Sequence, residues 1–102
     1  MNMMKMLQQA KSLQKNMEGA QAELAKTEVT GTSGGGAVSV TLTCGYVAKK
    51  VMLKPEAVDP QDIETLEDLL LTATADALKK VQDTVATKMK SITGGMGLPA
   101  GF

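Results

Sequence analysis

Lysine is the residue type whose spacing in this sequence could serve a chemical purpose, and that purpose is the neutralisation of an anion. Residues 1–17 contain lysines but no acidic residue, and residues 79–92 contain four lysines against Asp83 as the single acid. A lysine ammonium that contacts a nucleic-acid phosphate releases a condensed counterion, and this release favours binding. The candidate DNA-binding residues are therefore Lys5, Lys11, Lys15, Lys79, Lys80, Lys88 and Lys90.

The overall charge of the chain does not decide what these lysines bind. Eleven lysines balance eleven acidic residues, and the sequence contains neither arginine nor histidine, so the formal net charge is zero. Lysines are also common on solvated helix faces and at helix C-termini, so the pattern alone leaves both an anion-binding role and a plain solvated surface open. A third cluster, Lys49, Lys50 and Lys54, falls in a strand pattern, where lysines often only discourage aggregation.

Residue types that enzymes and metal sites need are scarce. The chain has no histidine to act as a general base, and Cys44 stands in an expected exposed or half-exposed turn without a visible activating partner. The acidic block at residues 56–68 lacks calcium-loop spacing, and the glycines at 34–36 are not followed by the Lys-Ser/Thr pair of a phosphate-binding loop. We therefore predict that the protein is not an enzyme and has no catalytic residues, metal site, cofactor or small-molecule substrate.

Two long helical patterns must position the lysines, and the first covers residues 3–26. Its apolar residues recur at alternating intervals of three and four, which is the a/d seam of a helix that pairs with another helix. An ordinary amphipathic core helix is the alternative, and the narrow seam favours the paired helix. The seam consists of Met3, Met6, Ala10, Leu13, Met17, Ala20 and Leu24.

The second helix is predicted over residues 60–93. Asp59 suits its N-cap, Pro60 suits its first position, and Gly94-Gly95 ends it. Residues 69–71 are all leucine, so the helix is apolar around most of this turn and we expect it to be buried on more than one side. The sheet can bury one side, and a second copy of the chain is the simplest partner for the other. If the two helices pack antiparallel, their lysine-rich segments meet at the far end of an arm.

Between the helices, residues 27–54 predict three antiparallel strands. Residues 37–43 alternate strictly, so Val38, Val40 and Leu42 line one apolar face of the middle strand. Weaker strand patterns precede and follow it, and tight glycine-containing connections join the three strands.

Two local features of the sheet can be predicted from the sequence, namely the turn after the middle strand and the side-chain parity of the last strand. Cys44-Gly45 forms the turn, and we expect Gly45 to adopt the left-handed conformation in it. Lys49 has the parity of the apolar face, which a β-bulge or a snorkelling side chain would reconcile.

The fold class is therefore α+β, with a three-stranded antiparallel sheet flanked by two long helices. We expect one domain over residues 1–93 and a glycine-rich C-terminal tail over residues 94–102. One cysteine cannot form an internal disulfide, which suits the reducing cytoplasm. No apolar run has the length of a signal-peptide core or of a membrane span, so we expect a cytoplasmic protein with no membrane partner.

Several stretches of the chain, in the same order and spacing, resemble the YbaB/EbfC family of bacterial nucleoid-associated proteins. They are EVTGTSGGG at residues 28–36, DP at 59–60 followed by LEDL at 66–69, and KM at 88–89 leading into TGGMGLPAGF at 93–102. The resemblance implies an α-β-β-β-α subunit, a tight tweezer-like homodimer with projecting helical arms, and a location at the nucleoid. It also implies binding to double-stranded DNA that alters DNA conformation, nucleoid organisation and gene expression.

The chain departs from the family pattern in two places. The family often carries arginine where this chain has only lysine, and a polar Asn-Gly-like turn where this chain has Cys44-Gly45. The absence of arginine favours charge contacts to phosphate over bidentate contacts to guanine.

Two hypotheses about function follow. In the first, a homodimer binds duplex DNA mainly through lysine–phosphate contacts, with little sequence preference, because arginine is absent and aromatic residues are few. In the second, the heptad seam and the arms form a homodimeric protein-interaction clamp or adaptor, and DNA binding is incidental.

Overall fold

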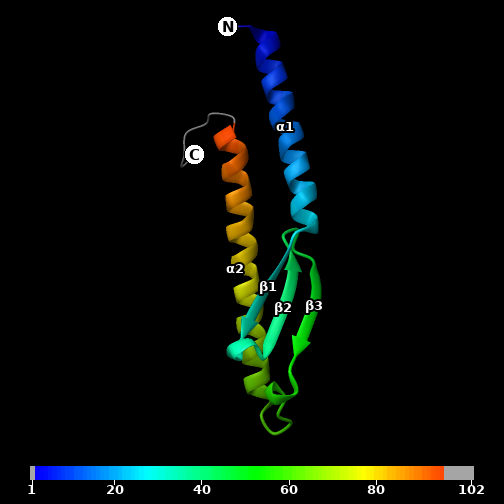
Figure 1. The fold of residues 1–102 in the computed structure, drawn as a ribbon, viewed down its shortest axis with the longest axis vertical. Coiled ribbons are helices and arrows are strands. Elements are labelled where there is room, and N and C mark those ends of the chain that lie inside the picture. The colour runs from blue at the N-terminus through cyan, green and yellow to red at the C-terminus, as the bar shows by residue number, and fades with distance from the viewer. Residues whose placement is uncertain (1, 96–102) are drawn as a thin grey trace.

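The computed structural model describes residues 2–95, which form two helices and a three-stranded sheet in the predicted order (Figure 1). The elements are α1 (Met3–Lys26), β1 (Glu28–Ser33), β2 (Val38–Thr43), β3 (Ala48–Leu53) and α2 (Ile63–Gly95). The strands lie in the order β1-β2-β3, and both neighbouring pairs are antiparallel. The predicted α+β class and strand meander are confirmed. The molecule is elongated, about 70 × 23 × 16 Å, because both helices extend beyond the sheet.

The core lies between β2 and α2. Val38, Val40 and Leu42 are buried as the alternation predicted, and they pack in one cluster with the small residues Ala73 and Ala77 of α2. Burial of this apolar face is the main source of stability for the subunit.

Gly31 allows α2 to approach the sheet closely. A Cβ atom at this position would stand 2.2 Å from the carbonyl oxygen of Ala73 and 2.2 Å from the backbone nitrogen of Ala77. Only glycine leaves room for helix backbone at that distance. The helix therefore crosses directly over β1 and β2.

The β2–β3 pairing contains a bulge. Thr41 pairs with Lys50 while Leu42 pairs with Ala48, so Lys49 is the extra residue on β3. An extra residue changes the side-chain parity of the strand after it. The structure thus contains the bulge, which is one of the two arrangements that would reconcile the parity of Lys49.

The turn between β2 and β3 differs from the prediction. Tyr46, not Gly45, has a positive φ angle, of 65°. Its N–H donates to the Thr43 carbonyl oxygen at 3.0 Å, and the N–H of Thr43 donates to the Val47 carbonyl oxygen at 2.8 Å. These bonds close a three-residue loop, in which the third residue takes the left-handed conformation.

The predicted exposure of Cys44 was also wrong. Its side chain is 4% exposed and belongs to the core cluster, whereas an exposed or half-exposed turn was expected. The N–H of Cys44 donates to the Thr27 carbonyl oxygen at 2.8 Å, so the residue extends the β1–β2 pairing and lies beneath the end of α1.

The helix α2 begins at Ile63, three residues later than the expected start at Pro60. Asp59 instead closes a separate turn, in which its carboxylate accepts from the Gln61 N–H at 2.9 Å. Asp62 caps α2: its carboxylate accepts from the backbone N–H of Thr65 at 3.2 Å and from the Thr65 hydroxyl at 2.6 Å. These bonds, the hydroxyl bond first, lower the pKa of Asp62 below its ordinary value.

The far end of α2 extends through Gly95, so Gly94-Gly95 does not end the helix before that point. The rest of the predicted C-terminal tail, residues 96–102, lies outside the described residues.

Most of the α1 seam is not covered by the rest of the chain. Ala20 and Leu24 are buried at its C-terminal end, while Met3, Met6 and Met17 are exposed. The pairing of this helix with another one stays a prediction. Within residues 2–95, no helix combines the length and apolar character that crossing a membrane requires.

Candidate nucleic-acid interface

The N-terminal half of α1 is a projecting basic helix. Lys5, Lys11 and Lys15 are exposed, and residues 2–17 contain no acid. Lys11 and Lys15 stand one turn apart on one face, and at ~1.5 Å rise per residue Lys5 lies about 15 Å from Lys15 along the axis. Side chains spaced in this way can contact separate phosphates of a nucleic-acid backbone.

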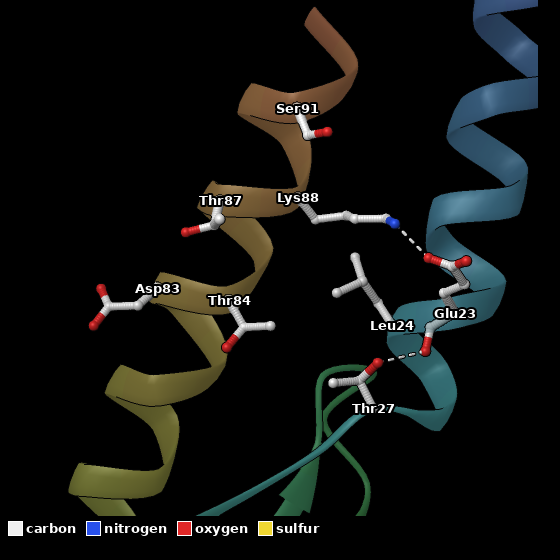
Figure 2. Close-up of a pocket in the computed structure, with 8 residues that line it drawn as sticks. All are labelled: Glu23, Leu24, Thr27, Asp83, Thr84, Thr87, Lys88 and Ser91. Carbon is white, nitrogen blue, oxygen red and sulfur yellow. Dashed lines mark hydrogen bonds and ion pairs between the residues drawn. The ribbon is translucent and has the colours of Figure 1, made fainter. Parts of the chain in front are cut away.

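The offset between the two helices follows from the ion pair between Glu23 on α1 and Lys88 on α2 (Figure 2). The helices run antiparallel (Figure 1), and both rise by the same distance per residue. Gly95, the described end of α2, is seven residues beyond Lys88, so it lies at about the height of the α1 residue seven positions before Glu23. The described end of α2 is therefore about level with Lys15. Lys5 and Lys11 project beyond it.

The two lysine-rich segments therefore do not meet at one tip, as the antiparallel packing alone suggested. The physical reason is that the first part of α2 lies along the sheet, so only its last part runs beside α1 (Figure 1). Lys79 and Lys80 stand beside the sheet, and Lys88 faces an acidic residue of α1. The projecting basic surface thus consists of α1 lysines.

Lys80 has structural partners. Its ammonium donates to the Thr30 carbonyl oxygen at 2.8 Å and lies 3.3 Å from the Asp76 carboxylate. The same carboxylate accepts from the Thr32 N–H at 3.0 Å. Side chains of α2 thus satisfy the backbone of the edge strand β1. The Thr32 N–H first, and then Lys80, hold the pKa of Asp76 below its ordinary value.

Lys88 is also engaged, through its ion pair and hydrogen bond with Glu23. The hydrogen bond and the charge of Lys88 lower the pKa of Glu23. Both side chains remain substantially exposed, so a phosphate could compete for the lysine. Sequence reasoning missed Glu23 because its partner lies 65 residues away along the chain. The remaining candidates, Lys79 and Lys90, are exposed on α2.

A groove of about 430 Å³ lies between the end of α1 and α2 (Figure 2). Its only cation is Lys88, and two carboxylates line it as well, so it has no excess of positive charge. The lining residues are Glu23, Leu24, Thr27, Asp83, Thr84, Thr87, Lys88 and Ser91. The groove is therefore a poorer place for an anion than the exposed lysines of α1.

Metal ligands do not gather in the described part of the chain. Across residues 2–95, no three Cys, Asp or Glu side chains come together in a way that could hold a metal ion.

Comparisons with known proteins agree on one family. A sequence model of the YbaB/EbfC DNA-binding family matches residues 1–96. A nucleoid-associated protein of Clostridium kluyveri is 44% identical over 101 residues, covering 99% of this chain and 89% of that protein. A nucleoid-associated protein of Bradyrhizobium sp. is 45% identical over 97 residues, covering 95% of this chain and 92% of that protein.

The fold also has a solved counterpart. The crystal structure of the uncharacterized protein HP0035 from Helicobacter pylori matches with a TM-score of 0.72 and 21% identity. The match covers 94% of this chain and 97% of that chain, so the two share the whole α-β-β-β-α arrangement.

Proposed function

The chain belongs to the YbaB/EbfC DNA-binding family, and from this membership we propose that it is a nucleoid-associated protein that binds duplex DNA as a homodimer. The contacts are mainly between lysine ammonium groups and phosphates, with little preference for sequence. The protein acts at the nucleoid, within the cytoplasm.

The observation that carries this proposal is the projecting, acid-free half of α1. Lys5, Lys11 and Lys15 stand exposed on a helix that extends beyond the sheet and beyond the described end of α2. A duplex can approach this helix without meeting a carboxylate on the same segment. A chain of zero net charge can therefore attract DNA locally, because the sign of the charge changes along its length.

The chemistry of lysine supports phosphate-led binding. Lysine presents a compact point charge, whereas the planar fork of arginine, absent from this chain, is the group that reads guanine in pairs of hydrogen bonds. The sequence has only Tyr46 and Phe102 as aromatic residues, so stacking on separated bases has little support. The proposed mode is backbone binding to a closed duplex.

Of the seven candidate lysines, the three on α1, Lys5, Lys11 and Lys15, contribute most to DNA binding. Lys80 and Lys88 must exchange their protein partners for phosphate before they can bind DNA. Lys79 and Lys90 can add contacts along α2. In a dimer the two sets of lysines would contact one duplex at separate places. These contacts constrain the path of the DNA and so alter the DNA conformation and the expression of nearby genes.

A salt titration tests the proposal. Binding of purified protein to two duplexes of unrelated sequence is measured by fluorescence anisotropy across a range of salt concentrations. We expect similar affinities for both duplexes. The logarithm of the binding constant should fall by roughly 0.9 for each phosphate contact when the salt concentration rises tenfold. Salt-independent binding would exclude phosphate-led recognition.

The second candidate function is a homodimeric protein-interaction clamp. The exposed Met3, Met6 and Met17 on the α1 seam favour it, because an uncovered apolar seam is typical of a helix that docks on a protein. Absence of DNA binding at low salt, with the dimer intact, would select this alternative.

A further inference from the structure

The strand β1 lies at an edge of the sheet, so it has a neighbouring strand on one side only. The Thr27 carbonyl oxygen, just before this strand, accepts from the N–H of Cys44 at 2.8 Å, so the backbone of residue 27 faces β2. Backbone groups of successive residues point to opposite sides of a strand, and Thr30 and Thr32 therefore direct theirs to the free side. A row of such groups is a template on which a strand of another chain can add.

Two side chains of α2 occupy the middle of this free side. The Lys80 ammonium donates to the Thr30 carbonyl oxygen at 2.8 Å, and the Asp76 carboxylate accepts from the Thr32 N–H at 3.0 Å. The two side chains stand one helical turn apart, and their charged atoms lie 3.3 Å from each other. Two outward backbone groups of β1 are thus already bonded within the subunit.

These bonds reproduce the pattern of a parallel neighbouring strand. One residue of an added parallel strand donates its N–H to the carbonyl oxygen before the residue opposite it, and accepts from the N–H after that residue. For a residue opposite Gly31, those two groups are the Thr30 carbonyl and the Thr32 N–H. Lys80 supplies the donor and Asp76 supplies the acceptor. Together they take the place of one residue of a parallel strand.

The close approach of α2 to β1 brings the two side chains within reach. A Cβ atom at Gly31 would stand 2.2 Å from the carbonyl oxygen of Ala73 and 2.2 Å from the backbone nitrogen of Ala77. Asp76 and Lys80 each follow one of these alanines by three residues, so they stand ~60° around the helix from the contact. Their long side chains can therefore extend past Gly31 to the outer groups of the strand.

We propose that Asp76 and Lys80 form an edge cap, which prevents β1 from accepting the strand β3 of another copy. Both β1 and β3 are antiparallel to β2, so they run in the same direction. In a copy stacked in the same orientation, β3 would lie parallel to β1, which is the direction that the cap imitates. Such a contact joins different surfaces of the two copies and leaves a new edge after each addition, so it would grow without closing.

The edge cap goes beyond the proposed function, because it concerns assembly and does not require DNA. It matters most on DNA, since copies bound side by side on one duplex are held at a high local concentration. The cap keeps the sheets of such copies separate. It also gives Lys80, one of the candidate DNA-binding lysines, a role within the subunit.

Removal of both side chains tests the edge cap. Asp76→Ala combined with Lys80→Ala, the uncapped variant, frees both backbone groups and keeps a good helix former at each position. Lys79→Ala combined with Asp83→Ala is the matched control, because it removes the same charges at the same spacing from exposed positions of α2. Sedimentation velocity at several protein concentrations, without DNA, measures assembly, and circular dichroism reports the fold. We expect species that grow with concentration for the uncapped variant, and wild-type sedimentation for the control.

Thr32→Pro, added to the uncapped variant, distinguishes strand addition from association of unfolded chains. Proline has no N–H to offer an added strand, and it is tolerated here because the ladder to β2 does not use the N–H of residue 32. We expect this substitution to restore wild-type sedimentation. A folded uncapped variant that sediments as the wild type would overturn the proposal. Larger species that persist with Thr32→Pro, or that form equally in the control, would do the same.

Lys80→Ala alone decides the case in which the uncapped variant unfolds. It leaves Asp76 bonded to the Thr32 N–H, so β1 keeps this contact with α2. We expect its association constant to rise at least about tenfold over the wild type, because the Thr30 carbonyl becomes free to accept from another copy. Lys80→Arg, which keeps a charged donor, should sediment as the wild type. Wild-type sedimentation of Lys80→Ala at every concentration would overturn the proposal.

Discussion

The carboxylate of Glu23 on α1 pairs with the ammonium of Lys88 on α2, and this ion pair joins the two helices beyond the edge of the sheet. It gives one of the candidate DNA-binding lysines an anionic partner within the protein. A DNA phosphate must displace Glu23 to use Lys88.

Glu23→Gln is expected to strengthen DNA binding about two- to fivefold, because an exposed ion pair of modest strength no longer holds the lysine. The affinity should also depend more steeply on salt, by roughly one unit of slope, since one more lysine contacts phosphate. Fluorescence anisotropy across salt concentrations measures both quantities. Glu18→Gln, which removes an equal charge from the same helix, is the control; equal slopes for the two variants would show that Glu23 does not withhold Lys88.

Lys11→Ala combined with Lys15→Ala is expected to weaken binding to all duplex sequences alike and to flatten the salt slope by roughly two units. Both sites are exposed and alanine favours helix, so the free energy of unfolding should change by no more than about 1 kcal/mol. Lys54→Ala, placed after β3, should have a much smaller effect on affinity. A larger effect of Lys54→Ala would move the DNA contacts from α1 to the sheet.

Gly31→Ala is expected to destabilise the protein by about 3 kcal/mol or more, because the new Cβ would overlap backbone atoms of α2 that cannot move independently. Gly19→Ala is the matched control within α1. A Cβ at Gly19 meets no atom within 4 Å, so alanine there should stabilise the helix by about 0.5–1 kcal/mol. Urea unfolding of both variants at one protein concentration measures the difference. A neutral Gly31→Ala would mean that α2 does not touch β1 as described.

Asp76 is expected to make stability depend on pH in acid. Its pKa is lowered in the folded protein, mainly by the Thr32 N–H and then by Lys80, so its contribution is present above the ordinary aspartate pKa. That contribution is lost as the pH falls through the lowered pKa of the folded state. Asp76→Asn should therefore lower stability at neutral pH and flatten its decline in acid. Thermal melts from neutral to acidic pH provide the measurement.

Asp83→Asn, an exposed substitution elsewhere on α2, serves as the reference for the Asp76 variant. If both variants lose stability in acid along the same curve as the wild type, the bond to β1 does not control this transition.

The sequence by itself determined the elements of this protein, because helix and strand patterns depend on residues close together in the chain. The alternation at Val38, Val40 and Leu42 identified the buried face of β2. The parity of Lys49 left a bulge and a snorkelling side chain open, and the register of the two strands shows the bulge. The basic character of the N-terminal half of α1 could also be predicted, because Lys5, Lys11 and Lys15 occupy a segment without acidic residues.

Tertiary structure alone decided which lysines have partners and which surfaces are bare. Lys80 meets the Thr30 carbonyl and Lys88 meets Glu23 across 50 and 65 residues of sequence, distances at which no local pattern specifies a contact. The close approach at Gly31 sets α2 toward β1, and from this offset follows the exposure of Val51 on β3. Packing geometry fixes that offset, because a helix settles where the backbone of the sheet lets it come nearest.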